Sequence, residues 1–171
     1  NAADLRVIME DSDALAIDLA VFDRTVAVNL RGHLLCTRAV LPHLLANETG
    51  AIVYTSSGSA HGSGPTRPCY AMTKAGLNAL MRHVASRWGK DGITANVLAP
   101  GFTVTGEMKK SMDAKAGEAE KWADHFMSRT PHTRLGLSED HAGVVAMLLS
   151  DDGRWINGAV LDVNGGGLMR A

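Results

Sequence analysis

The chain has 171 residues, of which 46% are apolar, 20% charged and only 5% aromatic, a composition typical of one globular domain. Its formal net charge of −1 excludes the strongly basic surface that binding to nucleic acid or to an anionic membrane requires. No apolar run reaches the roughly 18 residues of a membrane span, no signal peptide is visible, and Cys36 and Cys69 lack metal-ligand spacing. We therefore expect a cytoplasmic protein with reduced thiols, no metal and no membrane segment.

The first predicted elements are a loop with one helical turn over residues 1–20 and one long helix over residues 21–47. Apolar residues recur at helical spacing throughout the second segment. Pro42 is expected to bend the C-terminal end of this helix, and Asn29 is a poor residue for a helix interior. Asn29 is therefore either a satisfied polar residue on the flank of the helix or a local break that has a purpose.

A strand, a loop and a helix follow. Residues 51–57, AIVYTSS, are rich in β-branched side chains and predict a buried strand. A loop rich in glycine and proline comes next, and residues 70–88 predict a helix. Tyr70 and Lys74 stand four residues apart in the first turns of that helix, so both side chains leave the same face. Ser57 ends the strand on the other side of the loop.

This arrangement suits proton transfer to or from an alcohol or a carbonyl oxygen. A free phenol has a pKa of about 10, and a nearby ammonium group favours the phenolate, so we expect Lys74 to lower the pKa of Tyr70. A shift of roughly three units, worth about 4 kcal/mol, would bring this pKa near working pH, where general acid–base catalysis is efficient. The Ser57 hydroxyl can donate to a developing oxyanion. Alternatively, Tyr70 and Lys74 are ordinary surface side chains, because a Tyr-x-x-x-Lys spacing alone is a weak signal.

Two further strands are predicted, over residues 93–99 and 159–164. The first ends at the Pro100-Gly101 turn, and a loop at the carboxyl end of a parallel strand is where open α/β sheets bind ligands. The alternation of helices and strands predicts a doubly wound parallel α/β sheet in a single domain. Three strands make this sheet thin and leave one edge open.

Residues 106–130 predict one or two amphipathic helices between these strands. They form either a surface helix docked on the core or a mobile lid whose methionine and aromatic side chains line an apolar pocket. Ser138 is expected to cap the next helix, which carries acidic residues in its first turn.

Several ordered motifs form one pattern. Tyr70-Ala-Met-Thr-Lys74 is preceded by Ser57 at a distance of 13 residues (70 − 57), and Ser57 by Asn29 at 28 residues (57 − 29). With the segments 95–105 and 156–167 and the opening Asn1-Ala2-Ala3, these motifs resemble the classical type of the short-chain dehydrogenase/reductase family over essentially the whole chain. The resemblance implies a Rossmann-like fold, of which residues 1–171 would be the C-terminal two-thirds.

The resemblance also implies a role for each matching residue. Tyr70 would be the catalytic acid or base, Lys74 would bind the nicotinamide ribose and lower the pKa of Tyr70, Ser57 would hold the substrate oxygen, and the Asn29 backbone would hold a water in a proton relay. The cofactor, NAD or NADP, would contact Asn1, Ala2, Tyr70, Lys74, Pro100, Gly101, Thr103 and Thr105. The substrate pocket would involve Ser57, Gly58, His61 and Cys69, although His61 could be a solvated loop residue and Cys69 a small buried one.

One family feature is not recognised in the sequence: the glycine-rich turn that places a pyrophosphate on a helix N-terminus. Gly165–Gly167 closes the last strand and does not open a helix. The first hypothesis is therefore an NAD(P)-dependent oxidoreductase that interconverts a secondary alcohol and a ketone, and the second is a catalytically incompetent fragment or degenerate member with only a binding or structural role. A sugar epimerase or dehydratase is disfavoured, because its substrate domain would follow the last strand. The resemblance implies a homo-oligomer, a tetramer or dimer.

Overall fold

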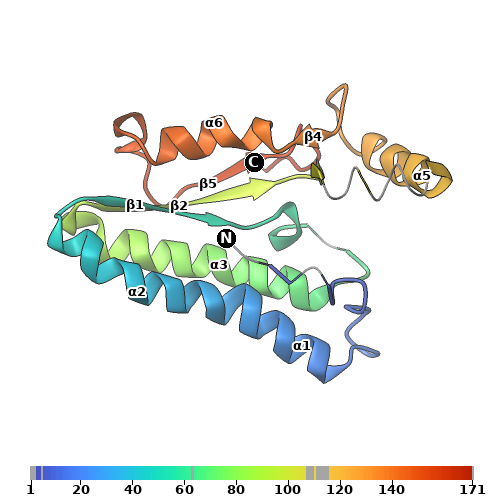
Figure 1. Ribbon diagram of the computed structural model, residues 1–171, viewed down its shortest axis with the longest axis horizontal. Coiled ribbons are helices and arrows are strands. Elements are labelled where there is room, and N and C mark those ends of the chain that lie inside the picture. The colour runs from blue at the N-terminus through green and yellow to red at the C-terminus, as the bar shows by residue number, and fades with distance from the viewer. Residues whose placement is uncertain (1–2, 5, 63, 107–109, 111–115, 171) are drawn as a thin grey trace.

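The computed structural model describes residues 3–4, 6–62, 64–106, 110 and 116–170. Its centre is a parallel sheet of three strands in the order β1 (Gly50–Thr55), β2 (Ile93–Pro100) and β5 (Val160–Val163). Helices cover both faces of this sheet, with α1, α2 and α3 on one face and α6 on the other (Figure 1). The predicted doubly wound, Rossmann-like arrangement is confirmed.

The central strand β2 is buried along almost its whole length, because it has a strand on each side and helices on both faces. Val97 lies opposite Tyr54 of β1 and Val160 of β5, which fixes the register of the sheet. Alanines on β2 let α3 approach the sheet closely. The core comprises Leu41, Tyr54, Met81, Val84, Ala85, Ile93, Ala95, Val97 and Ala99.

The long N-terminal helix is one continuous rod with an irregular turn in it. It consists of α1 (Leu19–Val26), a π-helical turn η1 (Ala27–Arg31) and α2 (Gly32–Ala46), which contains Pro42. A π turn inserts one extra residue into a helix and is frequent at functional sites. The break lies at Asn29, as the second of the two sequence interpretations expects.

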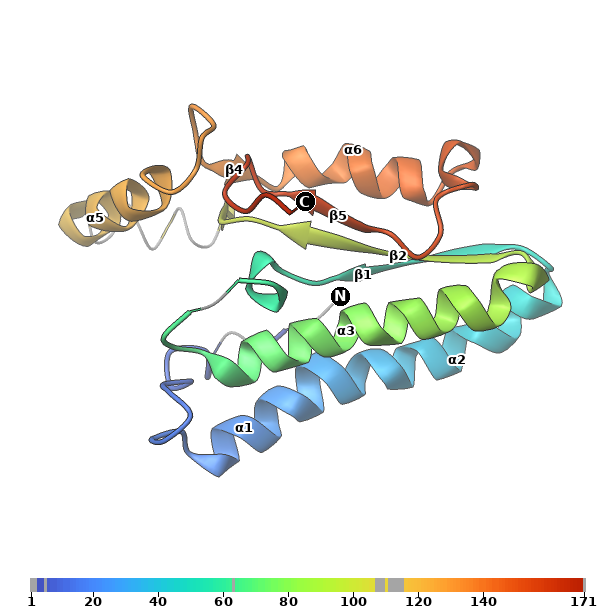
Figure 2. The ribbon, with the colours of Figure 1, turned by 180° about the vertical axis from the view of Figure 1, so that it is seen from behind.

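Helix α3 (Pro68–Trp88) lies alongside the α1–α2 rod beneath the sheet (Figure 2). It begins two residues before the predicted start, since a proline fits the first helical position. It ends at the short 3₁₀ turn η3 (Gly89–Asp91), followed by Gly92 with φ 81°. A Cβ at residue 92 would lie 2.2 Å from the carbonyl oxygen of Glu48, so only glycine fits this turn.

The C-terminal part contains two short strands that were not predicted, together with two helices that were, one within residues 106–130 and one after Ser138. Strands β3 (Thr103–Val104) and β4 (Gly136–Leu137) pair in parallel as a second, two-stranded sheet. Helix α5 (Ala116–Met127) precedes β4, and α6 (Glu139–Leu148) follows it. Two short 3₁₀ turns, η2 (Gly58–Ala60) and η4 (Asp151–Gly153), complete the described elements.

The predicted capping of α6 by the Ser138 side chain is wrong. Ser138 has helical backbone angles, and its side chain makes no capping hydrogen bond. The Asp140 carboxylate instead accepts from the backbone N–H of Leu137 at 2.8 Å and forms two short bonds with Arg134. The Asp140 carboxylate, within the first turn of α6, therefore bonds to the segment that precedes the helix and, as a negative charge at the N-terminus, complements the helix dipole.

In the part of the chain that the structure describes, no helix has the length and apolar character to cross a membrane, and no three His, Cys, Asp or Glu side chains gather as metal ligands would.

Candidate active site

The structure brings Ser57, Tyr70 and Lys74 together at the carboxyl end of β1. Ser57 follows the strand by two residues, and its hydroxyl acts on the Tyr70 phenol so as to lower the pKa of that phenol. The ammonium nitrogen of Lys74 lies 5.5 Å from the centroid of the Tyr70 ring. Ser57 and Tyr70 are both half-buried.

Two hydrogen bonds in opposite directions attach α3 to the end of β1. The Nζ of Lys74 donates to the carbonyl oxygen of Thr55 at 2.8 Å. The buried hydroxyl of Ser56 donates to the backbone carbonyl oxygen of Lys74 at 2.9 Å. Each bond satisfies a polar group that would otherwise be buried without a partner, and together they fix the height of Lys74 against the strand.

The N-terminus of α3 is held by a residue that the sequence interpretation missed. The carboxylate of Asp11, which is 3% exposed, accepts from the backbone N–H of Tyr70 at 2.8 Å and of Cys69 at 3.2 Å. Arg67 precedes the helix in a left-handed conformation with φ 68°, and its N–H donates to the carbonyl oxygens of Asp11 and Ser12. A carboxylate at this position satisfies orphan N–H groups and complements the helix dipole.

The protonation states differ from the sequence expectation. Burial raises the pKa of Tyr70, although the hydrogen bond from Ser57 and the positive charge of Arg67 act in the opposite direction. Burial also lowers the pKa of Lys74 to about 8. The pKa of Tyr70 is thus shifted in the direction opposite to the expected one, because the loss of hydration on burial is the largest influence on it.

Asn29 lies beneath this site with 0% exposure. Its Oδ1 accepts from the backbone N–H of Asp4 at 2.9 Å, whereas its Nδ2 has no hydrogen-bond partner among the described residues. The π turn around it packs against α3 at a glycine: a Cβ at Gly76 would lie 2.9 Å from a methyl carbon of Leu30. Close packing at Gly76 therefore brings the helix of Lys74 against the turn of Asn29.

The residues expected to line a substrate pocket divide into two groups. Gly58 stands next to Ser57 in the 3₁₀ turn η2 and is partly accessible. Cys69 is only 1% exposed, and burial raises its pKa to about 11, which fits the alternative of a small, unreactive core residue. The Nε2 of His61 lies 2.8 Å from the Asn78 amide and 3.0 Å from the Arg170 guanidinium, so this exposed imidazole is already engaged by protein groups.

The residues expected to meet a cofactor lie at the ends of β2 and β3. Pro100 and Gly101 end β2, and the Gly101 N–H donates to the Val163 carbonyl oxygen at 3.1 Å. The Thr103 hydroxyl donates to the Gly101 carbonyl oxygen at 3.1 Å and lies 2.8 Å from Nε2 of His141. These two contacts stabilise the loop and its packing on α6. Thr105 follows β3 directly. Asn1 and Ala2 lie outside the described residues.

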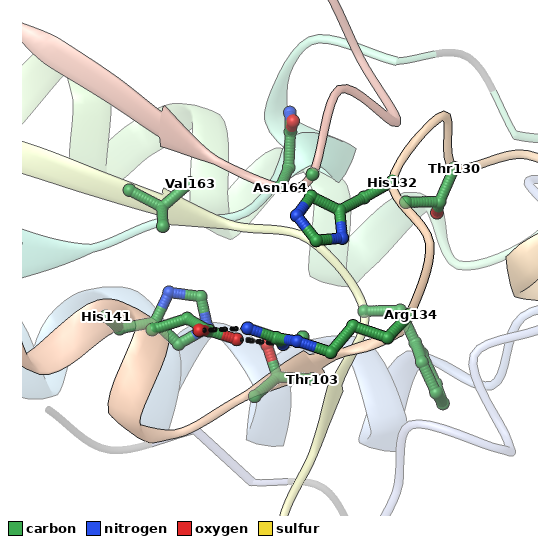
Figure 3. A pocket seen from close by; sticks show the side chains of 11 residues that line it. Thr103, Thr130, His132, Arg134, His141, Val163 and Asn164 are labelled. Carbon is green, nitrogen blue, oxygen red and sulfur yellow. Dashed lines mark hydrogen bonds and ion pairs between the residues drawn. The ribbon is translucent and has the colours of Figure 1, made fainter.

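A cavity lies beside this loop, on the α6 side of the sheet (Figure 3). This cavity of about 180 Å³ is lined by residues such as Thr103, His132 and Val163, with the Arg134–Asp140 ion pair at its edge. Ser57, Tyr70 and Lys74 are not among its lining residues. The adjacent ring of Phe102 stacks on Phe126 with centroids 3.7 Å apart, which anchors the C-terminal end of α5 on the loop and favours the docked helix over a lid at that end.

One glycine pattern was overlooked. Gly58, Gly62 and Gly64 have the Gly-x-x-x-Gly-x-Gly spacing and stand between a strand and a helix. They do not form a phosphate-binding turn, since the Asp11 carboxylate already occupies the N-terminus of the following helix and would repel an anion. The described residues thus supply no pyrophosphate cradle at α3.

Comparisons with known proteins identify the family and the fold of the chain. The family model described as enoyl-(acyl carrier protein) reductase matches residues 2–167. A protein named "Probable short-chain type dehydrogenase/reductase" from Bradyrhizobium diazoefficiens is 36% identical over 97% of this chain and 57% of its own length. Levodione reductase of Leifsonia aquatica is 37% identical over 86% of this chain and 55% of its own length.

A solved structure, ElxO with NADP bound, has a TM-score of 0.88 at 28% identity and covers 98% of this chain and 65% of that chain. The chain thus spans between 55% and 65% of the length of these three proteins. Since the family model covers nearly every residue and the relatives exceed 30% identity across most of the chain, the chain belongs to the short-chain dehydrogenase/reductase family of oxidoreductases.

Proposed function

We propose that the whole protein is an NAD(P)-dependent oxidoreductase that interconverts a secondary alcohol and a ketone, with Tyr70 as its acid or base. The observation that carries this proposal is the convergence of Ser57, Tyr70 and Lys74 at the carboxyl end of β1. Membership of the family and the NADP named with one structural neighbour support the cofactor class. The substrate is a small molecule whose oxygen lies between the Ser57 and Tyr70 hydroxyls.

The residues at this edge of the sheet fit the nicotinamide end of such a cofactor. The Lys74 ammonium can donate three hydrogen bonds, and one of them goes to the carbonyl oxygen of Thr55. As far as the described residues are concerned, two donors are left for ribose hydroxyls. We assign further contacts to Tyr70, to the Pro100-Gly101 turn, to Thr103 and Thr105, and to Asn1 and Ala2. When bound, the nicotinamide supplies or accepts the hydride. The pyrophosphate end lacks a matching cradle at α3, because Asp11 lies there.

Each side chain has a defined task in this reaction. Tyr70 donates its hydroxyl proton to the carbonyl oxygen during reduction and receives it back during oxidation. The Ser57 hydroxyl holds the same oxygen and stabilises charge that develops on it. The Lys74 ammonium places a positive charge 5.5 Å from the phenol ring and thereby limits the cost of a phenolate. The backbone of Asn29 completes the proposed proton path beneath Lys74.

We further propose that the whole protein works in the cytoplasm as a homo-oligomer, a tetramer or dimer. Exposed apolar side chains on α2 and α3, such as Leu34, Leu35 and Met72, supply a surface for association. The second candidate function is a catalytically incompetent member that acts only as an oligomeric binding or structural protein. The observation that favours it is that the Asp11 carboxylate accepts from the N–H groups at the start of α3, so this helix N-terminus offers no site for a pyrophosphate.

The substitution Tyr70→Phe in the whole protein separates these candidates. Removal of one hydroxyl should reduce NAD(P)-linked oxidation of secondary alcohols by at least about 10²-fold, since positioned acid–base catalysis contributes roughly 10²- to 10⁴-fold. Cofactor affinity, measured by fluorescence titration, should change little. Tyr54→Phe is the matched control, because the Tyr54 hydroxyl is buried against Thr37 and away from the site. Turnover of Tyr70→Phe within tenfold of the parent would remove Tyr70 from the mechanism.

A further inference from the structure

His61 is an exposed imidazole in the loop after Ser57, and the proposed reaction does not use it. Its Nε2 lies 2.8 Å from Nδ2 of Asn78 on α3 and 3.0 Å from Nη1 of Arg170 in the segment after β5. An arginine side chain can only donate hydrogen bonds, so Nε2 must be the acceptor. His61 is therefore neutral in this structure, with its proton on Nδ1.

The Asn78 amide has the orientation that this acceptor requires. Asn78 is 2% exposed, and its Oδ1 is buried without a hydrogen-bond partner among the described residues. Rotation of the amide by half a turn would bring Oδ1 towards Nε2 of His61 and place two acceptors together. The observed orientation leaves one buried oxygen unpaired, at a cost in free energy, and keeps the hydrogen bond to neutral His61.

His61 and Ser57 belong to one hydrogen-bonded turn. The Ser57 carbonyl oxygen accepts from the N–H of Ala60 at 3.0 Å, and the Ser57 hydroxyl accepts from the N–H of Ser59 at 3.1 Å. The N–H of His61 donates to the Gly58 carbonyl oxygen at 3.1 Å. A group that holds the His61 ring therefore also holds the turn that begins at Ser57.

The segment after β5 folds back onto this turn. Nδ2 of Asn164 donates to the Leu168 carbonyl oxygen at 2.8 Å, which closes the fold of this segment. A Cβ at Gly58 would lie 3.9 Å from a methyl carbon of Leu168, so the segment is in contact with the residue next to Ser57. Arg170 follows two residues later and reaches His61 from this side.

The charged groups around His61 come from three elements. Arg170 bonds to Asp162 of β5, with Nε 2.6 Å from Oδ2, and Arg82 belongs to α3. Partial burial lowers the pKa of His61 most strongly, the charges of the two arginines lower it further, and Asp162 raises it. Because the side chain is exposed, the ring exchanges protons directly with solvent.

We propose that neutral His61 is a pH-sensitive positioning residue: it accepts from Asn78 and Arg170 and so fixes the turn that carries Ser57. This inference rests on the proposed function, in which Ser57 holds the substrate oxygen. Protonation adds an N–H to Nε2, which can then no longer accept from Arg170, and places a second positive charge beside that guanidinium. Ketone reduction should therefore weaken as the pH falls through the pKa of His61, which lies below its ordinary value of 6.5.

The hydrogen bonds can be tested without turnover. Long-range ¹⁵N–¹H NMR of the whole protein reports the tautomer and the pKa of each histidine, and His61→Gln identifies the His61 signals. Neutral His61 should show the Nδ1–H tautomer, and Arg170→Met should raise its pKa. Arg154→Met is the matched control, because it removes an exposed positive charge from the turn before β5, and it should leave this pKa unchanged. The Nε2–H tautomer, or a His61 pKa that Arg170→Met does not alter, would overturn the proposal.

Turnover at two pH values gives the second readout. In the parent, kcat/KM for ketone reduction should be about tenfold lower at pH 5 than at pH 7, since a small displacement of a positioned group costs up to about 10²-fold. His61→Gln places an amide oxygen near the position of Nε2, where it can accept from the same two donors and does not titrate. The decrease towards pH 5 should therefore be absent in this variant. His61→Phe has no acceptor and should show the low value at both pH values.

The outcomes separate the two proposals. A tenfold decrease that persists in His61→Gln would show that His61 does not position Ser57 in a pH-sensitive way. If the unmodified whole protein reduces no ketone, the proposed function fails by itself, and the NMR titration then decides the contacts of His61 independently.

Discussion

The buried ammonium of Lys74 makes the stability of the fold dependent on pH. Its side chain is 4% exposed, and burial lowers its pKa to about 8 from 10.5. Between these two values the unfolded chain binds a proton that the folded chain does not. The free energy of unfolding must therefore rise with pH from about 8 to about 10.5.

The magnitude follows from the size of the shift. A difference of about 2.5 pKa units corresponds to about 3 kcal/mol, and the local slope is about 1.4 kcal/mol per pH unit. Cys69 opposes this trend above pH 9, because its pKa is raised to about 11 and its folded form keeps the proton longer. The window from pH 7 to pH 9 therefore isolates Lys74 best.

The substitution Lys74→Met tests this reasoning, since it removes the ammonium and keeps most of the apolar stem. Urea denaturation of both proteins at pH 7, 8 and 9 gives the free energy of unfolding at each pH. The difference between parent and variant should change by about 1 kcal/mol in favour of the parent from pH 7 to pH 9. The lost bond to Thr55 shifts every point equally and leaves this slope intact. Parallel pH profiles of the two proteins would show that Lys74 is not a desolvated cation.

Two further predictions concern the frame of the site. Asp11→Ala should destabilise the fold by about 1–3 kcal/mol, because it leaves two N–H groups of α3 unpaired. It should also lower turnover, because these N–H groups position Tyr70. The control Asp18→Ala removes the exposed cap of α1, and it should cost about 1 kcal/mol of stability and leave turnover unchanged. Equal losses of turnover would contradict this. Gly92→Ala should lower the melting temperature by several degrees or prevent folding, whereas Gly143→Ala in α6, which meets no atom within 4 Å, should be neutral or stabilising by up to about 1 kcal/mol. A tolerated Gly92→Ala would disprove the close contact with Glu48.

The parts of the fold that depend on local pattern could be predicted from the sequence. The β-branched run of β1 and the apolar run of β2 have strand character in isolation, and the predicted bounds differ from the observed ones by two residues or fewer. The same holds for α3, whose ends carry proline and glycine. Tyr70 and Lys74 could be paired because helical geometry fixes the relation of residues four apart.

The surroundings of the site depend on contacts between distant segments and could not be predicted in this way. Asp11 caps a helix that starts 57 residues later in the chain, so no local capping signal exists. Ser56 is adjacent to Ser57 in sequence, yet only the packed structure shows that its hydroxyl bonds to Lys74. The β3–β4 pair has two residues in each strand, too few for any periodicity. The direction of the Tyr70 pKa shift could not be predicted either, because burial, its largest cause, cannot be read from the spacing of residues.

Burial sets the resting protonation states of Tyr70 and Lys74. It raises the pKa of Tyr70 and lowers that of Lys74 to about 8, so each group is pushed toward its neutral form. At neutral pH the phenol keeps its proton, whereas Lys74 remains mostly charged because the pH is about one unit below its pKa. In the proposed reaction this resting state is the proton donor that ketone reduction requires. Alcohol oxidation first requires loss of the Tyr70 proton. Oxidation therefore depends on the positive charge of Lys74, which favours the phenolate, and on the path that carries the proton away.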